Sequence, residues 1–431
     1  MKKPAGERLR HQLMSALSTE VLSFGMAFLF SVATTRALMP EGKGIYSSVV
    51  ALVGITTSIA SFGVAKATIQ VTNRKGTNPA DVYAAVWWMT IPMCISASLV
   101  VLLLLPAGMD PVAITTAVGM SCAFIIAGNL EGMLRSKQRT LAINASALTQ
   151  SALPLGAVGL HVWRHGGSMS ATEVLGLSLL GWTARVMVLA FAYARLDAWP
   201  SRTRLRSLPW KDLVAFGAGY QVYAITWSLH MRQDISMAPY LCSATEVGLY
   251  ATAAGLAQML WRVPTAVGSV VLPRLAEAQG DKRSATMTAI ATRWSFTAVV
   301  IPAIGLGVVA PWLLGLLYGP DFVASAGPMR VLLPGVVTGA VYLVAASNLV
   351  ARGQLRPLIL IGVACTASNA LLNLILQPLY GGMGAAMASC ITYTASALGV
   401  IWVVMRDSGL PLSAFLLVQS DDLRRLLKRA G

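Results

Sequence analysis

Several ionisable residues of this sequence stand inside long apolar runs, and they are its strongest candidates for chemistry. A charge at the centre of a membrane-spanning helix costs about 2.5–3.5 kcal/mol on insertion scales, so one that persists is expected to face a cavity or a partner. The basic candidates are Arg36, Lys66, Arg185, Arg232, Arg262 and Arg293. Because basic residues outnumber acidic ones in these runs, the pattern favours an anionic ligand such as a phosphate or pyrophosphate, which Arg binds through paired hydrogen bonds. We therefore predict that these residues belong to a substrate cavity.

Asp234, His230 and Glu20 are candidates for charge pairing or ion coupling. His230 and Asp234 are four residues apart and share one face of a helix, whereas Arg232 and Asp234 are two apart and point to different faces. Two interpretations of Asp234 remain open. It neutralises an Arg of another helix, with Arg262 as the candidate, or it acts on substrate or a proton.

The composition indicates that a lipid bilayer surrounds these residues. Of the 431 residues, 56% are hydrophobic and 12% are charged, whereas soluble domains carry about 25% charged residues. We assign the formal net charge of +16 to cytoplasmic loops rich in Lys and Arg. Nucleic-acid binding needs a basic patch on a soluble face, which these apolar runs do not offer, so no nucleic-acid partner is expected.

The apolar runs are long enough for about twelve membrane-spanning helices, each of which needs about 20 mostly apolar residues. These segments cover approximately residues 13–38, 45–72, 81–106, 111–133, 140–162, 173–196, 210–240, 246–273, 286–317, 325–350, 355–379 and 383–405. Nearly all Lys and Arg residues between the segments then fall on the side of the N-terminus, and the outer loops hold only Arg36, Lys43 and Arg164. By the positive-inside rule, both termini are cytoplasmic.

This orientation distributes the basic candidates across the depth of the membrane. Lys66 and Arg293 lie toward the inner side, Arg185 lies near the middle, and Arg36 lies at the outer rim. For Lys66 a structural alternative remains open, in which its aliphatic stem extends to the inner membrane surface.

A turn sequence marks both halves of the chain. Pro40 and the glycines that follow it predict an outer turn between the first two segments. Gly44-Ile45-Tyr46 matches Gly248-Leu249-Tyr250 after the seventh segment, and Asn129-Leu130 near the end of the fourth segment matches Asn348-Leu349 near the end of the tenth. Two parallel repeats of six helices would place the working cavity between them. Chance similarity of helices rich in small residues is the alternative.

We predict an all-α polytopic membrane protein, with about twelve transmembrane helices in two parallel-repeat six-helix halves around a central cavity. The predicted parts are an N-terminal half (1–197), a cytoplasmic linker (198–211), a C-terminal half (212–407) and an amphipathic cytoplasmic tail (408–431). Basic and apolar residues mix in the tail, so we expect it to lie on anionic inner-leaflet lipids. A solvated, disordered tail is the alternative.

No cofactor or metal is expected. The sequence holds no nucleotide-binding P-loop, so an ion gradient or the membrane potential must energise any transport. His161 and His165 have the spacing of a metal pair but no third ligand nearby, and the Cys residues have irregular spacing. No Ser/His/Asp or paired-carboxylate arrangement stands out, so the pattern favours a transporter over an enzyme.

A series of short motifs follows the whole chain. They are Arg36-Ala-Leu-Met-Pro-Glu-Gly-Lys-Gly-Ile-Tyr46, Met231-Arg-Gln-Asp234, Glu246-Val-Gly-Leu-Tyr-Ala-Thr252, Leu272-Pro-Arg274, Tyr318-Gly-Pro-Asp-Phe322, Asn369-x-x-x-Asn373 and Tyr380-Gly-Gly-Met-Gly-Ala-Ala386. Their order resembles that of the polysaccharide transporters, the Wzx-type oligosaccharide flippases of the multidrug/oligosaccharidyl-lipid/polysaccharide (MOP) exporter superfamily. Met39 replaces the Gly usual in the first motif.

The resemblance implies a multi-pass protein of the bacterial inner membrane. It would move an undecaprenyl-pyrophosphate-linked oligosaccharide to the periplasmic leaflet for surface polysaccharide synthesis, with a polysaccharide polymerase as a candidate partner. Two alternatives of the same superfamily are a flippase for a lipid-linked peptidoglycan precursor and a cation-coupled multidrug exporter, which would favour an acidic cavity. A membrane glycosyltransferase or ligase would need a large soluble loop or catalytic carboxylates, and neither is evident.

Overall fold

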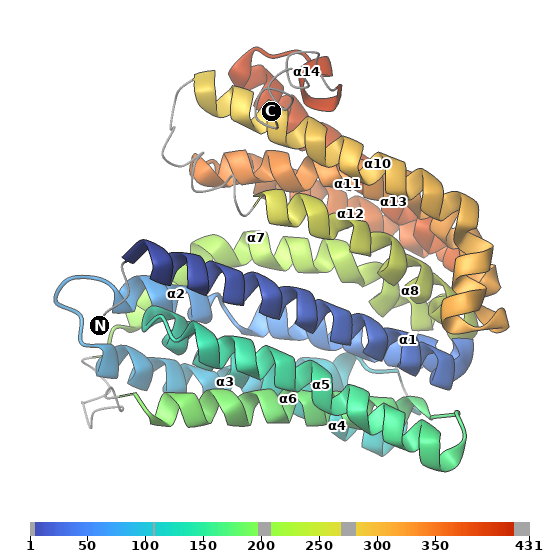
Figure 1. Ribbon diagram of the computed structural model, residues 1–431, viewed down its shortest axis with the longest axis horizontal. Helices are drawn as coiled ribbons and strands as arrows, with labels where there is room; N and C mark the ends of the chain where they lie inside the picture. The colour runs from blue at the N-terminus through green and yellow to red at the C-terminus, as the bar shows by residue number, and fades with distance from the viewer. Residues whose placement is uncertain (1–4, 107, 197–207, 269–281, 418–431) are drawn as a thin grey trace. The chain divides into compact units, whose positions relative to one another are not determined.

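The computed structural model describes the chain except for residues 1–4, 107, 197–207, 269–281 and 418–431 (Figure 1). Every regular element in the described part is a helix, which confirms the predicted all-α fold. The longer helices are α1 (Ala5–Ala60), α2 (Val64–Thr72), α3 (Pro79–Leu104), α4 (Pro111–Ser136), α5 (Thr140–His165), α6 (Ala171–Ala194), α7 (Trp210–Met237), α8 (Ala244–Gln258), α10 (Lys282–Tyr318), α11 (Ala326–Ala351), α12 (Leu355–Tyr380) and α13 (Gly382–Ser408). The short elements are η2 (Ala238–Tyr240), η3 (Met259–Trp261), η4 (Pro320–Ser325) and α14 (Ser413–Leu416).

Nine helices of the described residues are long and apolar enough to cross a membrane. One of them, Val21–Ala60, includes a kink and covers parts of the first two predicted segments. The seventh and eighth predicted segments fall on α7 and on α8 with η3, which are not among these nine. The chain is a multi-pass membrane protein, as its composition predicts.

The first two predicted segments meet at a single non-helical residue within α1. Met39 has φ 57° and ψ 170°, and Pro40 follows it directly. Because the ring of a proline disfavours the helical conformation of the preceding residue, the helix is interrupted at this step. Gly42 and Gly44 are helical, so the turn is shorter than the sequence predicts.

A second break separates α1 from α2, so the predicted segment 45–72 is not continuous. Gly63 has φ 66°, a left-handed conformation that glycine adopts without strain. It also approaches α7 so closely that a Cβ on Gly63 would lie 2.7 Å from the Gly217 carbonyl oxygen. The side-chain amide of Gln221 donates a hydrogen bond to the Ser58 carbonyl beside the break, which satisfies a backbone group that the helix no longer pairs.

The chain divides into two compact units, Met1–Ser228 and Leu229–Gly431, and the boundary lies within α7. In the first unit α6 packs on α4 and α5, and α1 packs on α5. In the second unit α13 packs on α11 and α12, and α11 packs on α10. The division into halves 1–197 and 212–407 stays a prediction, and most of the linker 198–211 lies outside the described residues.

The same tyrosine–serine hydrogen bond occurs in both units. The Tyr46 hydroxyl of α1 lies 3.1 Å from the Ser178 hydroxyl of α6. In the second unit the Tyr250 hydroxyl of α8 lies 3.1 Å from the Ser389 hydroxyl of α13. Tyr46 and Tyr250 are the residues that the repeated Gly-x-Tyr pattern aligns, so the pattern marks a repeated packing contact.

An asparagine–threonine hydrogen bond is repeated as well. Asn129 Nδ2 of α4 donates to Thr90 Oγ1 of α3 at 2.8 Å. Asn348 Nδ2 of α11 donates to Thr288 Oγ1 of α10 at 2.8 Å. All four side chains are buried. These contacts support the predicted internal repeat independently of the tyrosines.

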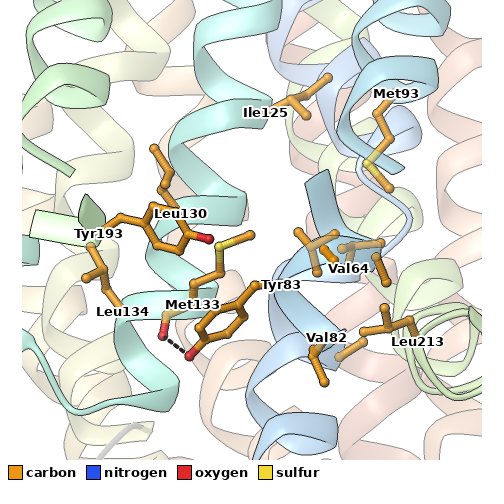
Figure 2. Packing of buried hydrophobic residues seen from close by; sticks show 14 of the residues in the cluster. Val64, Val82, Tyr83, Met93, Ile125, Leu130, Met133, Leu134, Tyr193 and Leu213 are labelled. Carbon is orange, nitrogen blue, oxygen red and sulfur yellow. Dashed lines mark hydrogen bonds between the residues drawn. The ribbon is translucent and has the colours of Figure 1, made fainter. Parts of the chain in front are cut away.

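An apolar core joins α2, α3, α4 and α6 in the first unit (Figure 2). Leu130 and Met133 of α4 are fully buried in it, and the Tyr83 hydroxyl of α3 donates a hydrogen bond to the Met133 carbonyl at 3.3 Å. Because this core fixes one face of α4, it also sets the position of Glu131, which is partly exposed, and of Arg135, which is exposed, on the same helix.

Candidate functional site

A cavity of about 770 Å³ lies in the first unit, lined by α2, α4 and the start of α7. Its polar and aromatic lining residues are Lys66, Gln70, Glu131, Arg135 and Phe216. Lys66 is exposed and is one of the predicted substrate residues. Two basic side chains on the wall of one cavity favour an anionic ligand.

Close packing of α2 on α4 brings Lys66 to this cavity. An added Cβ on Gly132 of α4 would lie 2.5 Å from the Ala65 carbonyl oxygen of α2. Such an approach requires a residue without a side chain. Because Lys66 follows Ala65 directly, this backbone contact sets the position of the ammonium group relative to Glu131.

Arg185 of α6 is held beside the cavity by two acceptors. Its Nη2 donates to Glu131 Oε1, and its Nη1 donates to Gln150 Oε1 of α5. The second oxygen of the same carboxylate, Glu131 Oε2, lies 3.5 Å from Arg135 Nη2. The carboxylate of Glu131 therefore joins a predicted substrate residue, Arg185, to a residue that lines the cavity, Arg135.

The Arg185 guanidinium retains donor capacity. Its Nε atom is buried and makes no hydrogen bond within the described residues. The guanidinium carbon lies 5.4 Å from the ring centroid of Trp182, which itself packs against Phe124. This aromatic support restricts the orientation of a group whose planar donors match the acceptor oxygens of a phosphate.

The cluster of Lys66, Arg135, Arg185 and Glu131 carries more positive than negative charge. The side chains of Arg185 and Glu131 are 17% and 16% exposed, and that of Arg135 is 55% exposed. The partly buried charges of Arg185 and Glu131 are screened less than surface charges. Because basic groups outnumber the single carboxylate in this cluster, the cavity favours an anion.

Asp234 is the centre of a buried polar cluster in the second unit. Its Oδ2 accepts hydrogen bonds from the Tyr250 hydroxyl and from Ser389 Oγ, the latter at 2.9 Å, and its Oδ1 accepts one from the Ile235 N–H at 2.8 Å. Since these partners among the described residues are neutral donors, the predicted pairing with Arg262 is not observed. A carboxylate that is 1% exposed and has no cationic partner in the described segments is a candidate site for a cation or a proton.

A ladder of buried amides on α12 extends this cluster. Asn369, Asn373 and Gln377 follow one another at four-residue spacing, and all are fully buried. Gln377 Nε2 donates to the Asp234 carbonyl at 3.0 Å and to Asn373 Oδ1 at 2.6 Å. Asn373 Nδ2 donates to Asn369 Oδ1 at 2.9 Å. Gln377 Oε1 is buried without a hydrogen-bond partner in the described part of the chain.

His230 is 4% exposed, and neither ring nitrogen has a hydrogen-bond partner in the part of the chain that the structure describes. Its ring packs edge-on against Tyr393 at a centroid distance of 5.2 Å, and Tyr393 lies 5.2 Å from Trp261. The predicted candidates His230 and Asp234 therefore lie in the same buried region of the second unit. Two unbonded imidazole nitrogens leave room for a proton or a polar ligand.

The structure does not bring the remaining predicted residues into either cluster. Arg36 lies beside the kink of α1 and is exposed, and Arg232 and Arg262 are exposed residues of the second unit. The side chain of Glu20 lies outside the described residues. The functional roles assigned to these residues stay predictions.

Arg293 has a structural partner. It is 4% exposed, and its Nη1 donates to the Ala414 carbonyl at 3.1 Å. Phe415, next to Ala414 in α14, is fully buried. This contact fixes α14 against α10, whereas residues 418–431 of the predicted tail lie outside the described part.

The sequence alone did not identify Glu131, Arg135 and Gln150 as site residues. The four-residue spacing of Glu131 and Arg135 in an apolar helix was a usable signal. The partnership of Glu131 with Arg185 joins two helices far apart in the sequence, so a single sequence holds no direct signal for it.

Comparison with known proteins identifies the family. Residues 10–279 match the model of a polysaccharide biosynthesis protein family. Among curated protein sequences, no significant match to the chain was found.

Solved structures that share the fold include two transporters and a flippase. A multidrug resistance MATE family transporter of the MOP superfamily, inward-facing, has a TM-score of 0.67 at 16% identity, covering 90% of this chain and 98% of that chain. The lipid II flippase MurJ in an inward closed conformation has a TM-score of 0.72 at 12% identity, and the match covers 92% of this chain and 88% of that chain. The third structure is a MOP superfamily transporter from Pyrococcus furiosus, for which a reversed polarity of the binding pocket suggests a different function. Its TM-score is 0.58 at 16% identity, and the match covers 91% of this chain and 95% of that chain.

At such identities the likeness concerns the fold, whereas the family model covers more than half of the chain. The predicted resemblance is confirmed: the chain belongs to the polysaccharide biosynthesis protein family and has the fold of MOP superfamily transporters.

Proposed function

We propose that this protein is a flippase that moves an undecaprenyl-pyrophosphate-linked oligosaccharide from the cytoplasmic to the periplasmic leaflet of the bacterial inner membrane. The translocated lipid would serve the synthesis of O antigen, capsule or exopolysaccharide. The observation that carries the proposal is the cavity in the first unit, where Lys66 and Arg135 line the wall and Arg185 bonds to Glu131. Membership of the polysaccharide biosynthesis family supports the choice of substrate class.

The chemistry of the substrate suits this cavity. The pyrophosphate is a compact anion with several acceptor oxygens, and the guanidinium groups of Arg185 and Arg135 can each donate two parallel hydrogen bonds to it. Lys66 adds a mobile point charge. The sugars would bind polar and aromatic side chains such as Gln70 and Phe216, while the lipid tail stays in the bilayer.

Both termini are proposed to be cytoplasmic, which places this cavity toward the cytoplasmic side, where the substrate enters. Arg36, Arg232, Arg262 and Arg293 are proposed as later contacts of the anion during alternating access. The C-terminal tail would lie on anionic inner-leaflet lipids, and a polysaccharide polymerase would receive the product.

The second unit is proposed to couple transport to an ion. Asp234 is buried among neutral donors, and His230 nearby has no hydrogen-bond partner in the described structure. A buried carboxylate of this kind is stabilised when it takes up a proton or a metal cation. Uptake on one side of the membrane and release on the other would drive the cycle.

A flippase for a lipid-linked peptidoglycan precursor is the second candidate, because the fold neighbours include a lipid II flippase. Such a substrate carries the same pyrophosphate, so the basic cavity alone does not separate the two. A cation-coupled multidrug exporter fits less well, since a cationic drug would be repelled by Lys66, Arg135 and Arg185.

Deletion of the gene tests the proposal. We expect lipid-linked oligosaccharide intermediates to accumulate on the cytoplasmic side and surface polysaccharide to be lost, with peptidoglycan synthesis unchanged. Normal surface polysaccharide together with accumulation of a peptidoglycan precursor would favour the second candidate. Absence of any lipid-linked intermediate would contradict both.

A further inference from the structure

Glu131 places a negative charge inside a site that is otherwise suited to an anion. Its two carboxylate oxygens face two different arginines, Oε1 facing Arg185 and Oε2 facing Arg135. We propose that Glu131 is a resident counter-ion, which occupies these arginines in the empty transporter and competes with the substrate phosphates for them. This inference rests on the proposed function, and it assigns to Glu131 the control of substrate affinity.

The geometry makes the carboxylate a stand-in for a phosphate. A carboxylate and a phosphate both present two oxygens at a spacing that matches the donors of a guanidinium. Gln150 holds the other terminal nitrogen of Arg185, so the guanidinium stays in place when Glu131 moves. The buried Nε of Arg185 has no hydrogen-bond partner among the residues that the structure describes, so it is a donor that Glu131 does not use.

Glu131 has space to leave. It lines the wall of the cavity of about 770 Å³, and its side chain is 16% exposed. The neighbouring residues Leu130 and Met133 are fully buried and fix the backbone of α4. Rotation of the Glu131 side chain into the cavity therefore requires no movement of the helix.

The exchange solves two problems of a transporter. In the empty transporter, Glu131 supplies the counter-charge of the partly buried Arg185. Without this carboxylate, the burial of the unpaired guanidinium would be costly. With substrate bound, the displaced carboxylate repels the phosphates, which limits their affinity and lets the substrate leave. A site built of three basic groups alone would bind a pyrophosphate too tightly for rapid release.

Binding of inorganic pyrophosphate to the full-length protein in detergent tests this inference, by titration calorimetry at low salt. Glu131→Gln keeps the shape and one acceptor oxygen but removes the charge. We expect it to bind pyrophosphate at least about tenfold more tightly than the wild type, because one nearby like charge is gone. Glu41→Gln is the matched control, since it removes an exposed carboxylate beside the kink of α1, and its affinity should equal that of the wild type.

A purely structural role for Glu131 predicts the opposite sign. If Glu131→Gln binds pyrophosphate as weakly as the wild type or more weakly, the inference is overturned while the anion site stands. If neither protein binds and both are folded, the proposed anion site itself fails. Should Glu131→Gln not fold, Glu131→Asp retains the charge but shortens its reach to Arg185, and it should bind pyrophosphate several-fold more tightly than the wild type. An Asp variant with unchanged affinity would then reject the inference.

Discussion

Replacement of Gly132 by alanine should separate α2 from α4 and displace Lys66 from the cavity. A Cβ at this position would lie 2.5 Å from the Ala65 carbonyl oxygen and 2.9 Å from its Cα. Both are backbone atoms, so no side-chain rotation relieves the overlap. Restoring an ordinary contact distance requires α2 and α4 to move apart by about 1 Å, and overpacking of this kind costs about 1–3 kcal/mol.

Gly128 provides a matched control in the same helix. It also lines the cavity, but a Cβ there would meet nothing within 4 Å. Gly128→Ala should therefore be neutral or stabilising by about 0.5–1 kcal/mol, through the higher helix propensity of alanine. Thermal unfolding of the purified proteins in detergent compares the two variants, and pyrophosphate affinity reports the position of Lys66. Equal unfolding midpoints for Gly132→Ala and Gly128→Ala would refute the reasoning.

Three further predictions concern the buried polar groups and the break before α2. Asp234→Asn should abolish the response of substrate transport to an imposed proton or sodium gradient in proteoliposomes, because the neutral amide no longer binds a cation; a retained response would contradict the ion-coupling role. Gly63→Ala should lower the thermal unfolding midpoint, since a left-handed φ alone costs a non-glycine residue about 1–2 kcal/mol and the new Cβ would also meet Gly217. A midpoint equal to that of the wild type would argue against the close approach. Asn129→Ala and Asn348→Ala should each destabilise by about 1–3 kcal/mol, because each leaves a buried threonine hydroxyl without its donor; markedly different losses would weaken the structural equivalence of the two repeats.

The fold class was predictable because composition and charge distribution act over the whole chain. Apolar segments of sufficient length and the Gly-x-Tyr repeat indicated the helices and their duplication, and the Tyr46 and Tyr250 hydrogen bonds give this repeat a physical basis. The breaks were less predictable. Gly63 breaks a segment where α7 approaches closely, and the partner residue Gly217 is distant in the sequence.

The candidate site was predictable only in part. Lys66 and Arg185 stood out because a charge in an apolar helix requires a partner or a cavity. Glu131 lines the same cavity as Lys66 and bonds to Arg185. This arrangement depends on the packing of α4 against α2 and α6, which no local pattern contains. The same holds for Asp234, whose neutral partners Tyr250 and Ser389 come from other helices.

Translocation of a lipid-linked oligosaccharide in proteoliposomes tests the central claim most directly. The substrate is placed in one leaflet, and its appearance in the other is followed with the wild type, Arg185→Ala and the exposed control Arg164→Ala. We predict that the wild type and Arg164→Ala accelerate translocation. Arg185→Ala, folded and reconstituted in equal amount, should be slower by at least about tenfold. This factor corresponds to the loss of about 1.4 kcal/mol of binding free energy to the pyrophosphate. A wild-type rate no higher than that of protein-free liposomes, or a full rate for Arg185→Ala, would contradict the account.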